Sequence, residues 1–220
     1  MRQQIVQQIK KALEQRNGFF IREEDIQLYL ANYLINTKLF DRVYIEYHIP
    51  SDLIGKYPWK DKKNIYVDIV VKYEDHFYPI EIKYKTVTQE VPDSFVFGEK
   101  AKTVLLGQHG AQNIGCYDFW KDVKRVELFD ETFSKCERGI VLFVSNDETY
   151  RKEPLNSVAG YANFSIHEGR SIPANSTLDW NKRDGEDLAV AKVRPPLTIT
   201  YEYVINWTPM QIDKHYYILV

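Results

Sequence analysis

Three polar residues stand within two apolar runs of the sequence, and their types suit the binding of a cation. Asp68 lies in the run Ile-Tyr-Val-Asp-Ile-Val-Val at 65–71, and Glu81 and Lys83 lie two residues apart in the next run. A buried and unpaired carboxylate is costly, so Asp68 needs a compensating partner, and a metal ion is one such partner. Carboxylate oxygens suit Mg²⁺ or Mn²⁺, and the Lys83 amine can orient a water molecule or balance charge on a phosphate.

A predicted β-hairpin brings these residues together. Its strands cover 64–73 and 77–85, with the polar break Glu-Asp-His between them. A turn centred near Asp75 places residue 82 opposite Asp68, or residue 81 if the centre shifts by half a residue. Glu81 and Lys83 share one strand face, and facing carboxylates repel unless a proton or cation separates them. An ordinary cross-strand ion pair between Glu81 and Lys83 is the alternative interpretation.

The remaining elements must support this hairpin. Hydrophobic periodicity predicts helices over 2–16, 22–38 and 111–128, and strands over 43–49, 139–145, 161–167 and 197–207. Glycines and polar residues predict a loop with one short helix over 86–108, and a long loop over 168–196. We therefore expect an α/β fold, with a mixed central sheet flanked by the helices near 22–38 and 111–128.

The domain organisation follows from the absence of repeats and of any convincing linker in the sequence. We expect a single domain over 1–220, with a core over about 20–146 and a β-rich C-terminal extension over about 147–220. A chain of this length is long enough to bury a substantial core.

The pattern Asp68-Ile-Val-Val…Glu81-Ile-Lys83, with an acid-bearing helix before it and a helix after it, resembles the PD-(D/E)xK superfamily of restriction-endonuclease-like nucleases. The resemblance implies Mg²⁺-dependent (or Mn²⁺-dependent) hydrolysis of phosphodiester bonds in nucleic acid, with DNA as the favoured substrate. It makes Asp68, Glu81 and Lys83 the catalytic residues, with the two carboxylates as metal ligands. Val67 stands where the superfamily name has proline, which is a commonly relaxed position.

The resemblance also predicts a third metal ligand, because a glutamate of the first core helix often joins the metal site in that superfamily. Glu23 is the expected residue because it extends the helix stripe of Ile26, Leu30 and Leu34, and Glu24 is the second choice. The alternative is that these acids only complement the dipole at the start of the helix. The segments 117–127, 145–150 and 164–170 are similar to those of one uncharacterised bacterial group within the superfamily.

Candidate substrate-binding residues are Lys85, Arg125 and Gln27. Lys85 lies on the same strand face as Glu81 and Lys83. For Arg125, the alternative to substrate binding is an ordinary ion pair with Asp122 within the same helix. A second class of function is a nuclease-fold module that binds nucleic acid or protein without cutting it. The formal net charge of −2 favours this alternative slightly, because only a local basic patch would attract a phosphate backbone.

Other sequence features bear on the cellular compartment of the protein and on the classes of function that it lacks. The two cysteines, Cys116 and Cys136, form no zinc-binding pattern and are expected to be free thiols in a reducing compartment. The sequence shows no signal peptide and no apolar run long enough for a membrane span, so we expect a cytoplasmic protein that does not bind membranes. Neither a phosphate-binding loop nor a serine-hydrolase motif is present. A partner protein or a homo-oligomer leaves no mark in the sequence.

Overall fold

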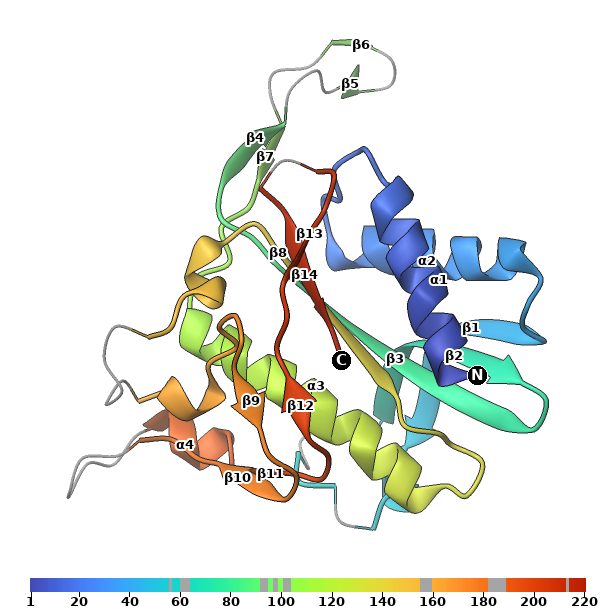
Figure 1. Ribbon diagram of the computed structural model, residues 1–220, viewed down its shortest axis with the longest axis vertical. Helices are drawn as coiled ribbons and strands as arrows, with labels where there is room; N and C mark the ends of the chain where they lie inside the picture. Colours follow the sequence, from blue (N-terminus) through green and yellow to red (C-terminus); the bar gives the residue numbers. More distant parts are fainter. Residues whose placement is uncertain are drawn as a thin grey trace.

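The computed structural model describes residues 1–55, 57–59, 64–91, 95–96, 99–100, 104–154, 160–181, 189–212 and 214–220. A six-stranded sheet with the strand order β1-β2-β3-β8-β14-β13 forms its centre (Figure 1). The strands are β1 (Arg42–Pro50), β2 (Asn64–Tyr73), β3 (His76–Lys85), β8 (Ile140–Ser145), β13 (Thr208–Pro209) and β14 (Tyr216–Leu219). Among the described strand pairs of this sheet, β3 with β8 is parallel and the others are antiparallel, so the sheet is mixed, as expected.

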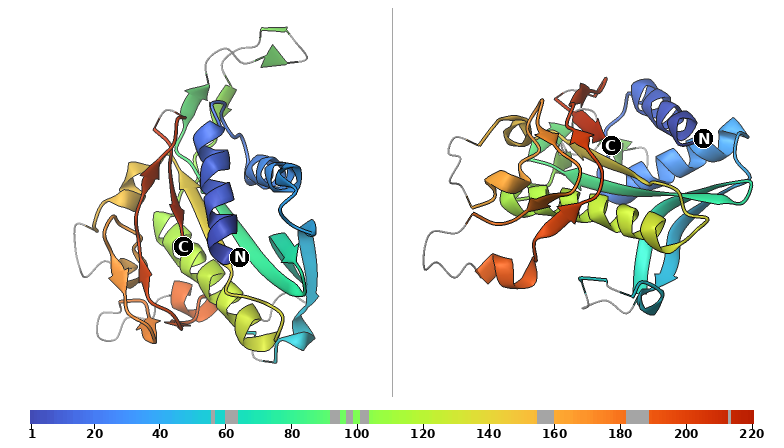
Figure 2. Two further views of the ribbon diagram at one scale, coloured as in Figure 1. Left: turned by 45° about the vertical axis from the view of Figure 1, so that its right-hand side comes forward. Right: turned by 60° about the horizontal axis from the view of Figure 1, so that its bottom comes forward.

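Helices cover both faces of this sheet (Figure 2). Helices α1 (Arg2–Gln15) and α2 (Glu23–Thr37) pack on one face, and α3 (Gln112–Thr132) packs on the other. The alternation of β8 shows the two layers: Ile140, Leu142 and Val144 belong to the core under α1 and α2, whereas Val141 and Phe143 belong to the core under α3. The structure thus confirms an α/β protein with a mixed sheet flanked by helices.

Local sequence explains where α2 begins and therefore where its first acid lies. The Asp25 carboxylate accepts hydrogen bonds from the backbone N–H groups of Ile21 (2.9 Å) and Arg22 (3.1 Å), which closes a capping box around Arg22. Buried Ile26, Leu30 and Leu34 then fix the helix on the sheet. Glu23 consequently occupies the first turn, at the edge of the helix nearest to β3.

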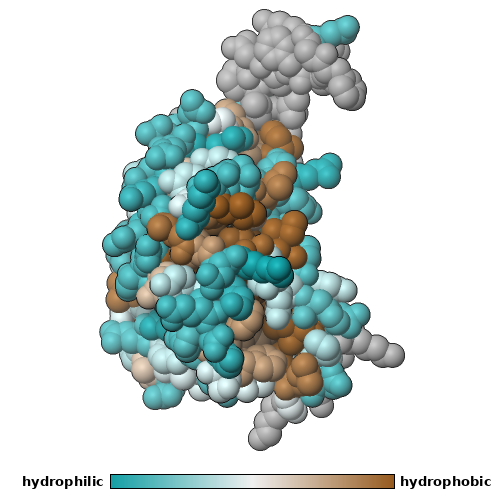
Figure 3. All heavy atoms as spheres, turned by 90° about the vertical axis from the view of Figure 1, so that its right-hand side faces the viewer, coloured by the Kyte–Doolittle hydropathy of each residue, from teal (hydrophilic) through white to brown (hydrophobic). Residues whose placement is uncertain are grey.

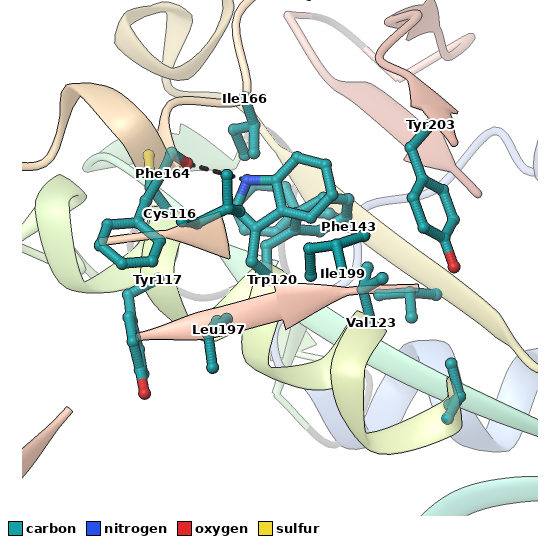
Figure 4. Close-up of a cluster of buried hydrophobic side chains, with 14 of the residues drawn as sticks. Cys116, Tyr117, Trp120, Val123, Phe143, Phe164, Ile166, Leu197, Ile199 and Tyr203 are labelled. Atoms are coloured by element: carbon teal, nitrogen blue, oxygen red, sulfur yellow. Dashed lines mark hydrogen bonds between the residues drawn. The ribbon is translucent and has the colours of Figure 1, made fainter. Parts of the chain in front are cut away.

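The C-terminal region differs in part from the expected strands and loop. The segment 161–167 forms a 3₁₀ helix (Ala162–Phe164) instead of a strand, because a turn lets Phe164 and Ile166 pack on Trp120 of α3 (Figure 4). The expected long loop contains β9 (Ser171–Ile172), β10 (Ser176–Leu178) and α4 (Ala189–Val193). The expected strand over 197–207 is divided into β11 (Leu197–Ile199), which pairs with β10, and β12 (Tyr203–Val204), which pairs with β9.

The segment between β3 and α3 also differs from expectation. Its described parts form two short antiparallel pairs, in place of a loop with a helix. The pairs are β4 (Gln89–Val91) with β7 (Val104–Leu106), and β5 (Phe95–Val96) with β6 (Glu99–Lys100). They extend beyond the end of β3 and away from the body (Figure 1). Two further 3₁₀ turns, Ser51–Leu53 and Glu148–Arg151, follow β1 and β8.

A buried glutamate fastens the C-terminal region to α3. The Glu127 side chain is fully buried, and its carboxylate accepts hydrogen bonds from the backbone N–H of Thr200 and of Tyr201 and from the Tyr203 hydroxyl. The Lys124 amine lies 3.3 Å from the same carboxylate. Since these donors lose a charged acceptor in Glu127→Gln, we expect the free energy of unfolding to fall by about 1–3 kcal/mol in urea denaturation.

The exposed Glu131, which also contacts Lys124 and Thr200, supplies the matched control. Glu131→Gln should cost less than about 1 kcal/mol, because water replaces the lost contacts. Equal losses in the two variants would show that Glu127 does not hold the C-terminal region in place.

Candidate active site

Strand β2 turns over at Asp68 and leaves β3. The two strands pair from Tyr73↔His76 to Ile69↔Ile80, and their described pairing ends there. Val67 packs in the core under α3, whereas Ile69 packs in the core under α1 and α2, although residues two apart on a regular strand share one face. Opposite this point in β1, Glu46 has a positive φ of 49°. A fork therefore opens between β2 and β3, with Asp68 at its base.

Two carboxylates occupy the fork and bind the backbone that it exposes. The Ile82 N–H donates to Asp68 Oδ2 (2.6 Å), and the Tyr84 N–H donates to Glu23 Oε2 (2.8 Å). Strand β3 stays paired with β8 on its other side as far as Lys85. The helix acid that reaches the hairpin is Glu23, as expected, while the Glu24 side chain is exposed to solvent. An ionised carboxylate has about four acceptor positions, so both acids keep capacity for other ligands.

An ion-pair network on α3 faces the same strand. The Lys83 amine lies 3.4 Å from Asp122 Oδ2 and 3.5 Å from Glu23 Oε1, so it links the two helices across the fork. The Arg125 guanidinium lies 3.2 Å from Glu81 Oε1 and 3.3 Å from Asp122 Oδ1. The pairing of Asp122 with Arg125 within the helix thus forms, but both residues also contact the hairpin.

The cluster holds more acids than bases. Two cations face four carboxylates within it: Lys83 and Arg125 against Glu23, Asp68, Glu81 and Asp122. Two buried oxygens, Glu81 Oε1 and Asp122 Oδ2, have ion-pair contacts but no hydrogen-bond donor within the described part of the chain. If all six groups are ionised, the cluster carries two surplus negative charges.

The pKa values of the carboxylates respond to this surplus and to burial. Burial raises the pKa of Asp68 to about 7, and the nearby Glu23 and Asp122 carboxylates add to the rise, although the Ile82 N–H opposes it. Burial also raises the pKa of Glu81 well above its ordinary value, and the charge of Asp68 contributes. The pKa of Lys83 is raised because Asp122, Glu23, Glu81 and Asp68 all surround its amine. The site therefore keeps its lysine charged and makes ionisation of its carboxylates costly.

A buried glutamine binds β1 and β2 beside the fork. The Gln27 amide donates to the Asp68 carbonyl (2.7 Å) and to Glu46 Oε1 (2.8 Å). The amide thus donates to both β1 and β2, at the point where β2 turns over. This places Gln27 as a support of Asp68, whereas the sequence suggested contact with a substrate.

A polar pocket of about 600 Å³ opens beside Asp68. The loop before β2, β2 itself, α3 and the segment after α4 line it, with Tyr57, Trp59, Tyr66, Asp68, Lys121 and Arg194 among the lining residues. Arg125 lines the pocket too, and donates to the Tyr66 carbonyl (2.8 Å).

Lys85 lies near Asp118. The pKa of Asp118 is raised overall, because burial and the charge of Asp122 outweigh the opposing charge of Lys85.

The structure brings together Asp68, Glu81, Lys83 and Glu23, four residues singled out from the sequence. The sequence favoured an ion pair of Asp122 with Arg125 within α3 over an approach of Asp122 to the site, and the structure shows both contacts. The sequence gave no indication of Glu46 or of the aromatic residues in the pocket. Cys116 and Cys136 are free thiols, as expected.

The donor chemistry suits a divalent cation, but the site is not closed around one. Across the described ranges, no three aspartate, glutamate, histidine or cysteine side chains converge to enclose an ion. Mg²⁺ requires less than a full protein cage, because it is commonly held by one or two carboxylates together with water and substrate phosphates. Asp68, Glu81 and the surplus negative charge fit that requirement.

Comparison with known proteins found no matching family model, no matching curated protein and no matching solved structure. None of the described helices is both long and apolar enough to cross a membrane. The class that the structure establishes is therefore an α/β protein with a mixed six-stranded sheet between helices.

Proposed function

We propose that this protein is a divalent-metal-dependent nuclease with a restriction-endonuclease-like fold, which hydrolyses phosphodiester bonds in nucleic acid and most readily in DNA. The observation that carries the proposal is the surplus of two carboxylates over cations at the fork between β2 and β3. A cluster of this kind is unfavourable unless bound protons or a cation compensate its charge, and a divalent cation does so while the carboxylates stay ionised.

Asp68 and Glu81 would hold Mg²⁺ or Mn²⁺, with Glu23 as a third acid across the fork. The ion would supply a Lewis acid for the phosphoryl oxygen and lower the pKa of an attacking water. Glu23 already accepts from the Tyr84 N–H, and Asp68 from the Ile82 N–H, so the backbone of β3 fixes one oxygen of each carboxylate. The other Glu23 oxygen contacts the Lys83 amine, and the other Asp68 oxygen would be available to the metal.

The residues around the carboxylates would orient the reacting groups and offset their charge. Lys83 keeps its proton beside four acids, so its amine orients the attacking water and offsets negative charge that develops at phosphorus. Arg125 orients Glu81 and Asp122, and Gln27 fixes the backbone of Asp68. Lys85 supplies positive charge near Asp118, where a phosphate of the substrate strand could lie.

A binding module that does not cut is the second candidate, and one surface favours it. Apolar side chains on and around α2 are exposed: Ile21 (42%), Leu28 (65%), Ile35 (55%) and Leu39 (39%). Figure 3, which views the side carrying α1 and α2, shows apolar surface among hydrophilic side chains. Scattered exposed apolar residues are common, however, and such a face does not explain the acidic cluster.

Metal binding and cleavage test the proposal directly. We expect Mn²⁺ to bind the wild-type protein in calorimetry, and plasmid DNA to be nicked when Mg²⁺ or Mn²⁺ is present. Asp68→Ala should lose both the heat of binding and the cleavage, because it removes the carboxylate at the base of the fork. Assays on single-stranded and double-stranded DNA and RNA would define the substrate.

The control is Asp75→Ala, in the turn of the hairpin, where the side chain is 79% exposed. It removes an acid from the same hairpin but should change neither measurement. Wild-type protein that binds Mn²⁺ but cuts no nucleic acid would favour the binding module. Unchanged metal binding in Asp68→Ala would show that the fork is not the metal site.

A further inference from the structure

The pocket beside Asp68 has the size of a site for a small group. Its volume of about 600 Å³ lies in the range of pockets that enclose drug-sized ligands, roughly 300–1,000 Å³. A nucleic-acid duplex is far too wide to enter such a pocket and could only lie across its mouth. One nucleotide, or two at most, suits the available space.

The walls of the pocket present aromatic rings. Tyr57 and Trp59 meet edge to face with ring centroids 5.3 Å apart, and the Trp59 indole N–H donates to the Tyr117 hydroxyl (3.2 Å). These residues are nearly buried and form a fixed wall. Tyr66, on β2 two residues before Asp68, lines the pocket and is 48% exposed, and its ring packs beside the His48 ring of β1 with centroids 5.3 Å apart. Aromatic side chains of this kind stack on nucleic-acid bases and show little preference for sequence.

Two other elements bring positive charge to the pocket, which the carboxylates of Glu46, Asp68 and Asp118 also line. The Lys121 amine of α3 lies 5.7 Å from the centre of the Trp59 ring. Arg194 follows α4, and its segment is pinned because the Trp180 indole donates to the Arg194 carbonyl (2.9 Å) and the Tyr117 hydroxyl donates to the Pro195 carbonyl (3.0 Å). The C-terminal extension thus completes a wall of the pocket. Cations beside aromatic rings are the combination found in sites for single-stranded nucleic acid.

We propose that this pocket receives an unpaired nucleotide adjacent to the scissile phosphate, so that the substrate must contain a single-stranded stretch. The inference rests on the proposed nuclease function and specifies the substrate of the same site. Asp68 is shared between the fork and the pocket, so a base held against Tyr66 places its own strand beside the carboxylates. The formal net charge of −2 agrees with local recognition of a strand, because no global basic field is present to bind a duplex.

Binding without metal provides the test. Fluorescence anisotropy in EDTA would compare a fluorescein-labelled single-stranded 12-mer with the same sequence as a blunt duplex. We expect the single strand to bind at least about tenfold more tightly, since stacking on aromatic side chains contributes only when the base is free. Tyr66→Ala should lower the single-strand affinity about tenfold or more and leave the weak duplex binding unchanged.

Two further variants sharpen the comparison. Tyr66→Phe retains the ring and should restore the affinity that Tyr66→Ala loses. Val204→Ala, on the exposed side of β12 and outside the pocket, should bind like the wild type. Circular dichroism would verify that Tyr66→Ala folds, as its exposed position leads us to expect.

Cleavage of a blunt duplex, a single strand and a duplex with an unpaired bubble then separates the two proposals. Preference for the single strand and the bubble supports the inference. Equal cleavage of the uninterrupted duplex, with Tyr66→Ala unaffected, overturns the inference but leaves the nuclease function standing. Single-strand binding that depends on Tyr66, without cleavage in any metal, supports the pocket and overturns the nuclease. Binding of a free mononucleotide with no preference for single-stranded DNA overturns the inference.

Discussion

Lys83→Ala is expected to reduce cleavage by at least about a hundredfold while Mn²⁺ binding persists. Its amine lies between Glu23 and Asp122 and cannot itself ligate a cation, so its contribution falls on the chemical step. Removal of one preorganised charged group from an active site commonly slows the reaction about 10²–10³-fold. Initial rates on supercoiled plasmid, measured beside calorimetry with Mn²⁺, would separate the two effects.

The same substitution should also lower stability, because the Lys83 amine is only partly exposed and Asp122 is buried. We expect the free energy of unfolding to fall by about 1–3 kcal/mol. Adding Asp122→Asn removes the uncompensated charge and should recover part of that loss, without restoring cleavage. The double variant therefore distinguishes lost chemistry from lost structure.

Lys135→Ala is the matched control, since this lysine pairs with Asp75 at the exposed end of the same hairpin. It should cost less than about 1 kcal/mol and leave cleavage unchanged. Undiminished cleavage by Lys83→Ala would mean that the active site lies elsewhere in the protein.

The hairpin and its acids could be predicted from the sequence because local rules dominate there. Two β-rich runs with a short polar break fix a register, and Tyr73↔His76 places residue 81 opposite Asp68 if the pairing is continued, the second of the two expected alternatives. Helix periodicity likewise selected Glu23, which extends the buried stripe of α2. These relations depend on residues close together in the chain.

The network around Asp122 and the pocket depends on contacts between distant segments, and sequence periodicity does not report these. In the sequence, Asp122 is an ordinary polar position of an amphipathic helix. Its contact with Lys83 of β3 exists only in the folded chain. Trp59 becomes a pocket wall only because α3 and the segment after α4 enclose it. The fork follows from the turn of β2 at Asp68, which moves Val67 and Ile69 into different cores. The apolar pattern of residues 65–71 shows no break at this point, so the sequence does not indicate the fork.

Tertiary packing also overrode local propensity in the C-terminal region. The β-leaning segment 161–167 forms a 3₁₀ turn because Phe164 and Ile166 reach the α3 core more directly from a turn than from a strand. The Trp120 indole fixes this turn by donating to the Phe164 carbonyl (3.0 Å). The last strands, β13 and β14, lie in the expected β-rich extension and continue the sheet beside β8.

Asp68→Asn is expected to be more stable than the wild type at pH 8 without metal. The pKa of Asp68 is about 7 in the folded protein against an ordinary value of 3.8, so the folded state binds the proton more tightly. Stability therefore falls as the pH rises from about 4 to above 7, and the ionised carboxylate then costs at most about 4 kcal/mol. Asparagine removes this cost and can still accept from the Ile82 N–H.

Thermal melts in EDTA between pH 4 and pH 8 would measure the difference, which should be small at pH 4 and largest at pH 8. We expect a gain of about 2–4 kcal/mol at pH 8, reduced by any amide proton that lacks an acceptor. Asp75→Asn, in the exposed turn, should show no comparable trend. Added Mn²⁺ should stabilise the wild type and have little effect on Asp68→Asn, because binding to the folded state alone raises stability. If Asp68→Asn is instead less stable at pH 8, the carboxylate serves to cap the free amide of β3, and the fork is a structural joint and not a metal site.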